Sequence, residues 1–173
     1  MRILRRLFVV PLANNNHGKT RIVNSLLSQG LGADSPGQKG RRILRSPWGR
    51  RIDALVFVRS FQETEKKDHP TVLAALEEED SEWYTRDLVI MPSHLHREDV
   101  SQMVTAAHHH GFDAIVAAVL REDNERNHYG ECWAEAWDER WNIPNPSREG
   151  GWEAQTEALG RDLWTWICEA FRS

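Results

Sequence analysis

The chain has 173 residues, which is enough to bury the core of one compact domain spanning residues 1–173. Its 22 Lys and Arg residues against 26 Asp and Glu residues give a net charge of −4, which does not indicate a nucleic-acid-binding protein. The two cysteines, Cys132 and Cys168, exclude a disulfide framework, and we expect both to be small buried residues of a cytoplasmic protein. No apolar run reaches the length of a membrane span, so no membrane association is predicted.

The first predicted element is a buried strand that begins at Ile3 or Leu7 and ends at Leu12, because this run is almost continuously apolar. The arginines ahead of it resemble the start of a secretion signal. The apolar run is too short for that role, however, and it leads directly into a polar loop. A helix is predicted next, over residues 18–29, because the apolar side chains there recur with helical spacing.

The loop between this strand and this helix has the sequence ANNNHGKT, residues 13–20. It resembles the relaxed Walker A pattern, A/G-x4-G-K-S/T, of P-loop nucleoside triphosphate hydrolases. The chain departs from the common form at Ala13, where glycine is usual. The resemblance implies an α/β fold, a three-layer sandwich with a mainly parallel sheet, and a site for a nucleoside triphosphate and Mg²⁺.

The resemblance also gives each residue of the loop a role. The backbone N–H groups and the helix N-terminus would hold the phosphates. Lys19 would reach the β- and γ-phosphates, and the Thr20 hydroxyl would bind Mg²⁺. The nucleotide-binding residues that it implies are Ala13, Asn14, Asn15, Asn16, His17, Gly18, Lys19, Thr20 and Arg21.

A hairpin with strands over residues 41–45 and 52–59 is predicted next. Lys and Arg are concentrated over residues 39–51, around Trp48. This concentration fits a solvated hairpin, which we favour because solvated runs of charge are common. It also fits a patch that binds nucleic acid, since arginines pair with phosphates and tryptophan stacks on bases.

Helices and strands alternate after the hairpin, with helices expected over residues 71–79 and 97–110 and strands over 87–91 and 112–120. This alternation predicts an α/β domain with a mainly parallel sheet.

The last third of the chain is predicted to be helical and rich in tryptophan. Trp133, Trp137 and Trp141 recur every four residues, which predicts one apolar stripe on a helix that packs against the sheet. A second helix is predicted over residues 153–171.

The order of elements is similar to that of Ras-like GTPases, in which a strand at a similar spacing ends in DxxGQ. Here the strand is followed by Ser60-Phe61-Gln62-Glu63, without the Asp and the Gly. No guanine-recognition motif NKxD follows Leu120 either. Guanine specificity is therefore unsupported, and ATP is favoured over GTP.

Phosphoryl transfer also requires an acid that organises the metal or the nucleophile. No Asp ends an apolar strand in the usual way, so the candidates are Glu63, Glu122 and Asp123. Arg121 and Arg126 resemble the lid arginines of small-molecule P-loop kinases, although a solvated charged loop explains them equally well. The predicted catalytic residues are Lys19, Glu63, Arg121 and Arg126.

His94 and His96 form an HxH pair after a predicted strand, a spacing that occurs in metal sites. No acidic third ligand lies nearby in the sequence. We therefore expect His94 to be a polar group near the phosphates and His96 to cap the helix that follows.

The function predicted from these patterns is Mg²⁺-dependent binding of a nucleoside triphosphate, with phosphoryl transfer to an unknown acceptor or hydrolysis. The missing strand-end acid also fits a nucleotide-binding interaction module with little or no turnover and a protein partner. Association with nucleic acid through residues 39–51 is the less favoured form of that alternative.

Overall fold

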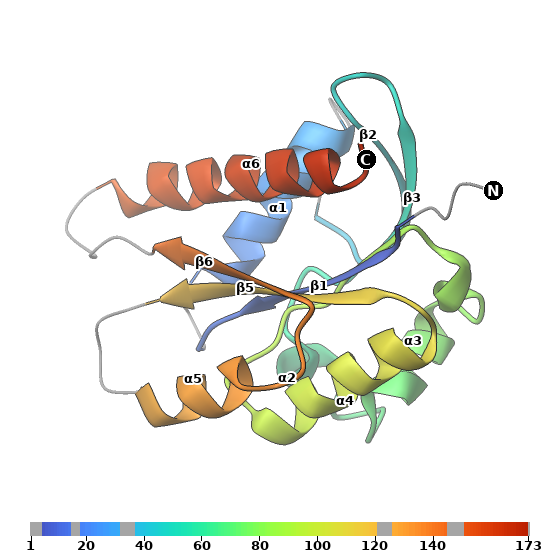
Figure 1. Ribbon diagram of the computed structural model, residues 1–173, viewed down its shortest axis with the longest axis vertical. Helices are drawn as coiled ribbons and strands as arrows, with labels where there is room; N and C mark the ends of the chain where they lie inside the picture. Colours follow the sequence, from blue (N-terminus) through green and yellow to red (C-terminus); the bar gives the residue numbers. More distant parts are fainter. Residues whose placement is uncertain (1–4, 15–17, 32–36, 121–125, 145–150, 173) are drawn as a thin grey trace.

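The computed structural model describes residues 5–14, 18–31, 37–120, 126–144 and 151–172. These residues form an α/β fold with a six-stranded sheet in the order β2-β3-β4-β1-β5-β6 (Figure 1). All neighbouring strands are parallel except β2 and β3, which form an antiparallel hairpin. The strands are β1 (Leu7–Leu12), β2 (Gly40–Arg45), β3 (Arg51–Val56), β4 (Leu88–Ile90), β5 (Asp113–Leu120) and β6 (Glu139–Pro144).

Helices cover both faces of the sheet (Figure 1). Side chains of β1 alternate between these faces, as the pleat of a strand requires. Leu7 and Val9 pack with α1 and α6 on one face, and Phe8 and Val10 pack with α3 and α4 on the other. The helices are α1 (Lys19–Leu31), α2 (Phe61–Thr64), α3 (Val72–Glu79), α4 (Arg97–His109), α5 (Arg126–Trp133) and α6 (Trp152–Ala170), with a short 3₁₀ turn, η1, at Trp83–Thr85.

The predicted strand and helix at the start of the chain are confirmed as elements, as are the hairpin and the strand–helix alternation through β5. Boundaries moved by a few residues. The strand after the hairpin turn ends at Val56, so that Arg59 lies outside it. Cys132 and Cys168 are buried and free, as expected, and burial raises the pKa of each thiol to about 12.

The prediction of a wholly helical last third was wrong. Only Trp133 of the three expected stripe residues lies in a helix, at the end of α5, and Trp141 lies in β6. β6 pairs with β5 in parallel, and Trp141 stacks on Trp166 of α6 with their ring centroids 6.3 Å apart. Pairing with β5, a contact distant in sequence, overrides a local spacing that suits a helix.

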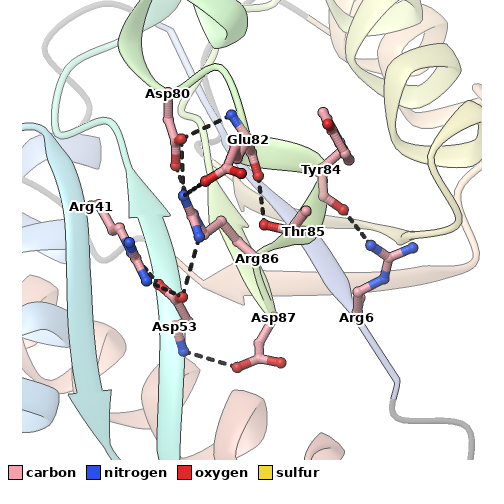
Figure 2. A network of polar contacts seen from close by, with 9 residues as sticks. All are labelled: Arg6, Arg41, Asp53, Asp80, Glu82, Tyr84, Thr85, Arg86 and Asp87. Atoms are coloured by element: carbon pink, nitrogen blue, oxygen red, sulfur yellow. Dashed lines mark hydrogen bonds and ion pairs between the residues drawn. The ribbon is translucent and has the colours of Figure 1, made fainter.

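An ionic network at the N-terminal end of β4 fixes the segment between α3 and this strand (Figure 2). The Arg86 side chain is only 7% exposed, and its guanidinium donates to both carboxylate oxygens of Asp80, at 2.7 and 3.0 Å. It also reaches Asp53, which pairs with Arg41 on β2. Hydrogen bonding from Arg86 lowers the pKa of Asp80. This network ties the hairpin to the middle of the sheet.

The basic segment is partly neutralised by the fold. Lys39 pairs with Glu65 and Glu79 at 3.0 and 2.9 Å, and Arg41 forms a two-pronged pair with Asp53. Trp48 at the hairpin turn is exposed, with the Arg172 guanidinium 5.2 Å from its ring centroid. The predicted hairpin over residues 39–51 is therefore confirmed. Because Lys39 and Arg41 form ion pairs, the segment carries less unpaired positive charge than its composition indicates.

Among the helices that the structure describes, none combines the length and the apolar composition needed to cross a membrane.

The helices α1 and α6 approach each other closely, side by side on one face of the sheet (Figure 1). A Cβ atom at Gly160 of α6 would lie 2.5 Å from the Ile22 carbonyl oxygen and 2.6 Å from Ser25 Cβ, both on α1. The Ser25 hydroxyl donates to the Glu157 carbonyl oxygen at 2.6 Å. Only glycine allows this approach, so α6 holds the start of α1 in place.

Because a methyl group at residue 160 meets backbone and Cβ atoms that cannot move aside, we expect Gly160→Ala to lower the free energy of unfolding by about 1–3 kcal/mol. Urea unfolding followed by circular dichroism measures the change. Gly130→Ala is the matched control, since Gly130 lies in α5 with no atom within 4 Å of the added Cβ. That control should be neutral or stabilising by up to about 1 kcal/mol. An equal decrease in the free energy of unfolding in Gly160→Ala and Gly130→Ala would contradict the close packing of α6 on α1.

Candidate functional site

The site is built where β1 ends and α1 begins. Ala13 is buried directly after β1, and Gly18 precedes the helix with a φ of +87°, a left-handed conformation that favours glycine. A Cβ at Gly18 would lie 3.1 Å from Thr156 Cγ2, so α6 also packs on the loop. The predicted residues Asn15, Asn16 and His17 lie outside the described residues.

Lys19 is the first residue of α1, and it is buried, with 5% of its surface exposed. Its ammonium group donates to the carbonyl oxygens of Ala13, at 2.7 Å, and Asn14. No carboxylate lies within salt-bridge distance of its Nζ atom in the part of the chain that the structure describes. Burial lowers the pKa of Lys19 to about 8, against a smaller opposing effect of the negative charge on Glu63. Lys19 is thus a buried cation held by neutral groups alone.

An open cavity of about 820 Å³ lies beside Lys19. Gly18, Lys19 and Thr20 line it together with Glu63. The polar side of α1 and the first turns of α6 form the rest, with Asn24, Ser25, Ser28, Gln29, Glu157 and Arg161. The cavity therefore joins a buried cation, a helix N-terminus and several hydroxyl and amide groups, which is a setting for an anionic, oxygen-rich ligand.

The remaining predicted site residues are placed as follows. Thr20 is exposed in the cavity, and Arg21 also lines it while pairing with Glu153 at 3.6 Å. Arg126 is the first residue of α5, which lies with α4 on the face of the sheet opposite to α1. Arg121 lies outside the described residues, as do Glu122 and Asp123. The structure thus brings Lys19, Thr20, Arg21 and Glu63 to one cavity.

Glu63 reaches the cavity from α2, a single turn that follows β3. One oxygen of its carboxylate accepts a hydrogen bond from the Ser60 backbone N–H at 3.1 Å, an arrangement in which an acidic side chain closes the first turn of a helix. The other oxygen lies 3.7 Å from Nε2 of His94. Because β4 lies between β3 and β1, this short helix brings Glu63 to the cavity that Gly18, Lys19 and Thr20 also line.

His94 follows β4, and its loop is joined to the loop after β1 by backbone hydrogen bonds. Ser93 N donates to the Pro11 carbonyl oxygen at 3.0 Å, and Ala13 N donates to the Ser93 carbonyl oxygen at 3.3 Å. Burial lowers the pKa of His94, and the positive charge of Lys19 lowers it further. His94 is therefore neutral near pH 7 and lies within the electrostatic reach of Lys19.

Gln62 is a positioning residue that the sequence did not single out. Its amide nitrogen donates to the Ser93 hydroxyl at 3.0 Å and to Asp99 at 2.8 Å, while its amide oxygen accepts from the His94 backbone N–H at 3.0 Å. Asp99 is 1% exposed and also pairs with Lys66 at 2.9 Å. These contacts join α2, α4 and the loop after β4 into one hydrogen-bonded unit.

The HxH pair is divided between two roles. His96 caps α4, as expected, with its ring nitrogen accepting from the Asp99 backbone N–H at 3.4 Å, whereas His94 turns toward Glu63. Within the described part of the chain, no three His, Cys, Asp or Glu side chains are grouped so that they would hold a metal ion.

A second cavity of about 450 Å³ shares Thr20 and Asn24 with the first. Arg59 and His69 contribute side chains to it from beyond the end of β3. Arg59 lies within salt-bridge distance of no acidic side chain among the described residues. Thr20 and Asn24 of α1 thus lie between the two polar cavities.

The sequence matches no protein-family model and no curated protein. Among solved structures, the chain is similar to a de novo designed protein determined by solution NMR for the Northeast Structural Genomics Consortium. The two are 16% identical, with 91% of this chain and 89% of that chain covered and a TM-score of 0.42. This likeness is too low to support a conclusion about fold or function.

Replacing a buried cation that has no counter-charge removes a desolvation penalty, so we expect Lys19→Met to raise the free energy of unfolding at pH 7 by about 1–3 kcal/mol. The unfolded chain binds the Lys19 proton up to about pH 10.5, whereas the folded chain releases it near pH 8. The penalty is thus fully present below pH 8 and is relieved as the pH rises toward 10.5. In urea titrations, the difference in the free energy of unfolding between Lys19→Met and the parent protein should therefore decrease as the pH rises from 8 to 10.5.

Lys66→Met is the control for this measurement. Lys66 pairs with the buried Asp99, so its loss should destabilise the fold by about 1–3 kcal/mol. If Lys19→Met destabilised the chain at pH 7 as Lys66→Met does, Lys19 would be a structural residue.

Proposed function

We propose that the chain binds a nucleoside triphosphate with Mg²⁺ at the loop of residues 13–21 and transfers or hydrolyses its terminal phosphoryl group. The observation that carries this proposal is the buried Lys19 ammonium, which lines a polar cavity at a helix N-terminus without a carboxylate partner among the described residues. Such a cation is stabilised by an anion that enters the cavity. The ANNNHGKT sequence supports phosphate as that anion.

The residues present fit the proposed ligands. In the proposal, Gly18 and Lys19 supply backbone N–H groups to the phosphates, and the Lys19 ammonium contacts the β- and γ-phosphates. Thr20 presents an exposed hydroxyl to the cavity, where Mg²⁺ bound to a nucleotide needs one or two protein oxygens besides phosphate and water. Mg²⁺ would neutralise charge that develops on the phosphate oxygens.

Glu63 is the carboxylate for the chemical step. In phosphoryl transfer, a water or hydroxyl oxygen forms a bond to the γ-phosphorus while the bond to the bridging oxygen breaks and a nucleoside diphosphate leaves. Glu63 lines the same cavity as Lys19, and in the proposal it orients the nucleophile and accepts its proton. In the proposal, an acceptor molecule binds in the second cavity, which shares Thr20 and Asn24 with the first. Adenine is the base proposed, since the sequence lacks a guanine-recognition motif.

One observation favours a second candidate, a nucleotide-dependent interaction module with little turnover. Glu63 lies on α2 instead of at a strand end, and one of its oxygens is occupied by the Ser60 backbone N–H. An acid committed to closing a helix turn is a weaker base. Steady-state phosphate release separates the candidates, because an interaction module predicts a rate for the parent protein equal to that of a Lys19 variant.

Mg²⁺ with ATP should raise the melting temperature of the parent protein, because a ligand that binds only the folded state stabilises it. The rise should depend on nucleotide concentration, and adenosine alone should give none. Lys19→Met should abolish it, while Thr20→Val should weaken it chiefly in the presence of Mg²⁺. Lys67→Met removes an exposed lysine of the same charge and should leave the rise intact. A rise that Lys19→Met leaves unchanged would refute the proposal.

A further inference from the structure

The hairpin of β2 and β3 ends in a basic turn, residues 45–51, which we call the hairpin tip (Figure 1). It carries Arg45, Arg50 and Arg51 around the exposed Trp48. Because β3 runs parallel to β4 and β1, the turn that precedes β3 lies at the edge of the sheet where β1 begins. Lys19 follows the end of β1, so the hairpin tip is a separate surface that the function proposed above does not use.

Two arginines of the hairpin tip face each other without a counter-charge. Arg45 and Arg51 lie directly opposite each other in the β2–β3 pair, and both are exposed. Neither lies within salt-bridge distance of an acidic side chain among the described residues. Asp53, two residues further along the same face of β3, already pairs with Arg41 and Arg86 (Figure 2). Like charges directly opposite each other destabilise a strand pair, so an anion bound between the two guanidinium groups would relieve their repulsion.

Trp48 is presented by a turn that is fixed before any partner binds. The Gly49 N–H donates to the Ser46 carbonyl oxygen at 2.9 Å, and the Ser46 hydroxyl accepts from the Arg50 N–H at 3.0 Å. Pro47 restricts the backbone ahead of Trp48, and Gly49 takes the left-handed conformation after it, with a φ of +84°. Trp48 is 43% exposed. Binding through this side chain therefore requires little further ordering of the chain.

The end of the chain adds charge beside the tryptophan. The Arg50 guanidinium donates to the Phe171 carbonyl oxygen and lies 5.0 Å from the centroid of the Phe171 ring. The Arg172 guanidinium lies 5.2 Å from the Trp48 ring centroid and pairs with Glu169 at 3.4 Å. Glu169 balances only one of the arginines at this surface, so its positive charge is in excess.

Protection of a sheet edge does not account for this combination. β2 is an edge strand, and charged side chains on an edge prevent it from pairing with other chains. That explains Arg45, but β3 is an inner strand, and so Arg51 needs another reason. An exposed tryptophan favours association and works against edge protection. Arginines that pair with phosphates beside an aromatic ring that stacks on bases are typical of surfaces that bind single-stranded nucleic acid.

We propose that the hairpin tip binds single-stranded nucleic acid, with Arg45 and Arg51 contacting a phosphate group and Trp48 stacking on a neighbouring base. These contacts use backbone charge and the face of a base, so binding is independent of sequence and weakens as salt is added. The net charge of −4 keeps the affinity low, because the rest of the protein repels a polyanion. A duplex, an acidic polypeptide or an anionic membrane offers negative charge but no unstacked base for Trp48.

Fluorescence anisotropy of labelled oligothymidylate, titrated with protein between about 50 and 200 mM NaCl, tests the proposal. The parent protein should bind, and the logarithm of its affinity should fall linearly with the logarithm of the salt concentration. Arg45→Gln and Arg51→Gln should each reduce that slope by about 0.7, the value for one phosphate contact on a single strand. Trp48→Ala should weaken binding about tenfold at every salt concentration, and Trp48→Phe should retain most of the affinity.

Lys67→Gln is the matched control for charge, because it removes an exposed lysine that lies outside the hairpin tip. Its affinity should stay within about twofold of the parent value and its slope should be unchanged. Arg45→Gln and Arg51→Gln each remove one member of a repulsive pair, so their melting temperatures should equal or exceed that of the parent protein. A loss of binding in these two variants is then not a loss of fold.

No binding by the parent protein at low salt would overturn the proposal, as would an equal loss of affinity in Lys67→Gln and Arg51→Gln. Poly-glutamate or phosphatidylglycerol vesicles that displaced the labelled strand as well as unlabelled oligothymidylate does would show a surface for acidic partners in general and would reject nucleic acid as the occupant. If Trp48→Ala does not fold, the parent protein still tests the stacking contact. It should prefer the single strand to a duplex of the same length, and equal affinity for both would contradict the role of Trp48.

Discussion

The arrangement of this protein centres on one buried charge. Lys19 begins α1 with its ammonium group desolvated and held by the carbonyl oxygens of Ala13 and Asn14. Burying a cation without a counter-charge carries a large desolvation penalty. β1 is buried on both faces, while α6 packs on Gly18 through Thr156 and on α1 through Gly160. Strongly perturbed pKa values cluster at functional sites, which is why the function proposed here is centred on Lys19.

Glu63 and His94 come to the neighbourhood of Lys19 from other parts of the chain. Because β4 lies between β3 and β1, Glu63 is brought to the cavity by the single turn of α2, and its carboxylate accepts from the Ser60 backbone N–H at the start of that turn. The loop after β4, which includes His94, forms backbone hydrogen bonds with the end of β1 and with Ala13. Gln62 and Asp99 lock these two loops together. The positions of α2, which carries Glu63, and of the loop that carries His94 therefore depend on one hydrogen-bonded unit.

The local features of the fold followed from the sequence. The apolar run before the loop, the helical spacing after it and the turn residues of the hairpin are all decided within about ten residues of chain, and β1, α1, β2 and β3 formed as predicted. β6 was missed because tryptophans four residues apart suit a helix, while its strand form depends on pairing with β5.

The sequence indicated which chemical groups of the cavity could act, namely those of Lys19, Thr20 and Glu63. It did not indicate the contacts that position them, because Gln62 and Asp99 lie 37 residues apart and no sequence spacing links them. The spacing of Ser60 and Glu63 was the one available signal for α2, since a serine followed three residues later by glutamate is typical of a helix start.

The central claim is that a nucleotide phosphate supplies the counter-charge that Lys19 lacks. An anion bound at Lys19 raises its pKa, so binding must be accompanied by uptake of a proton wherever the free protein is partly deprotonated. Calorimetric titration of Mg²⁺ and ATP in two buffers of different ionisation enthalpy measures this uptake directly. The account predicts little uptake at pH 7, about half a proton at pH 8 and more at pH 9. Nucleotide binding without proton uptake across this range, or no binding at all, would contradict it.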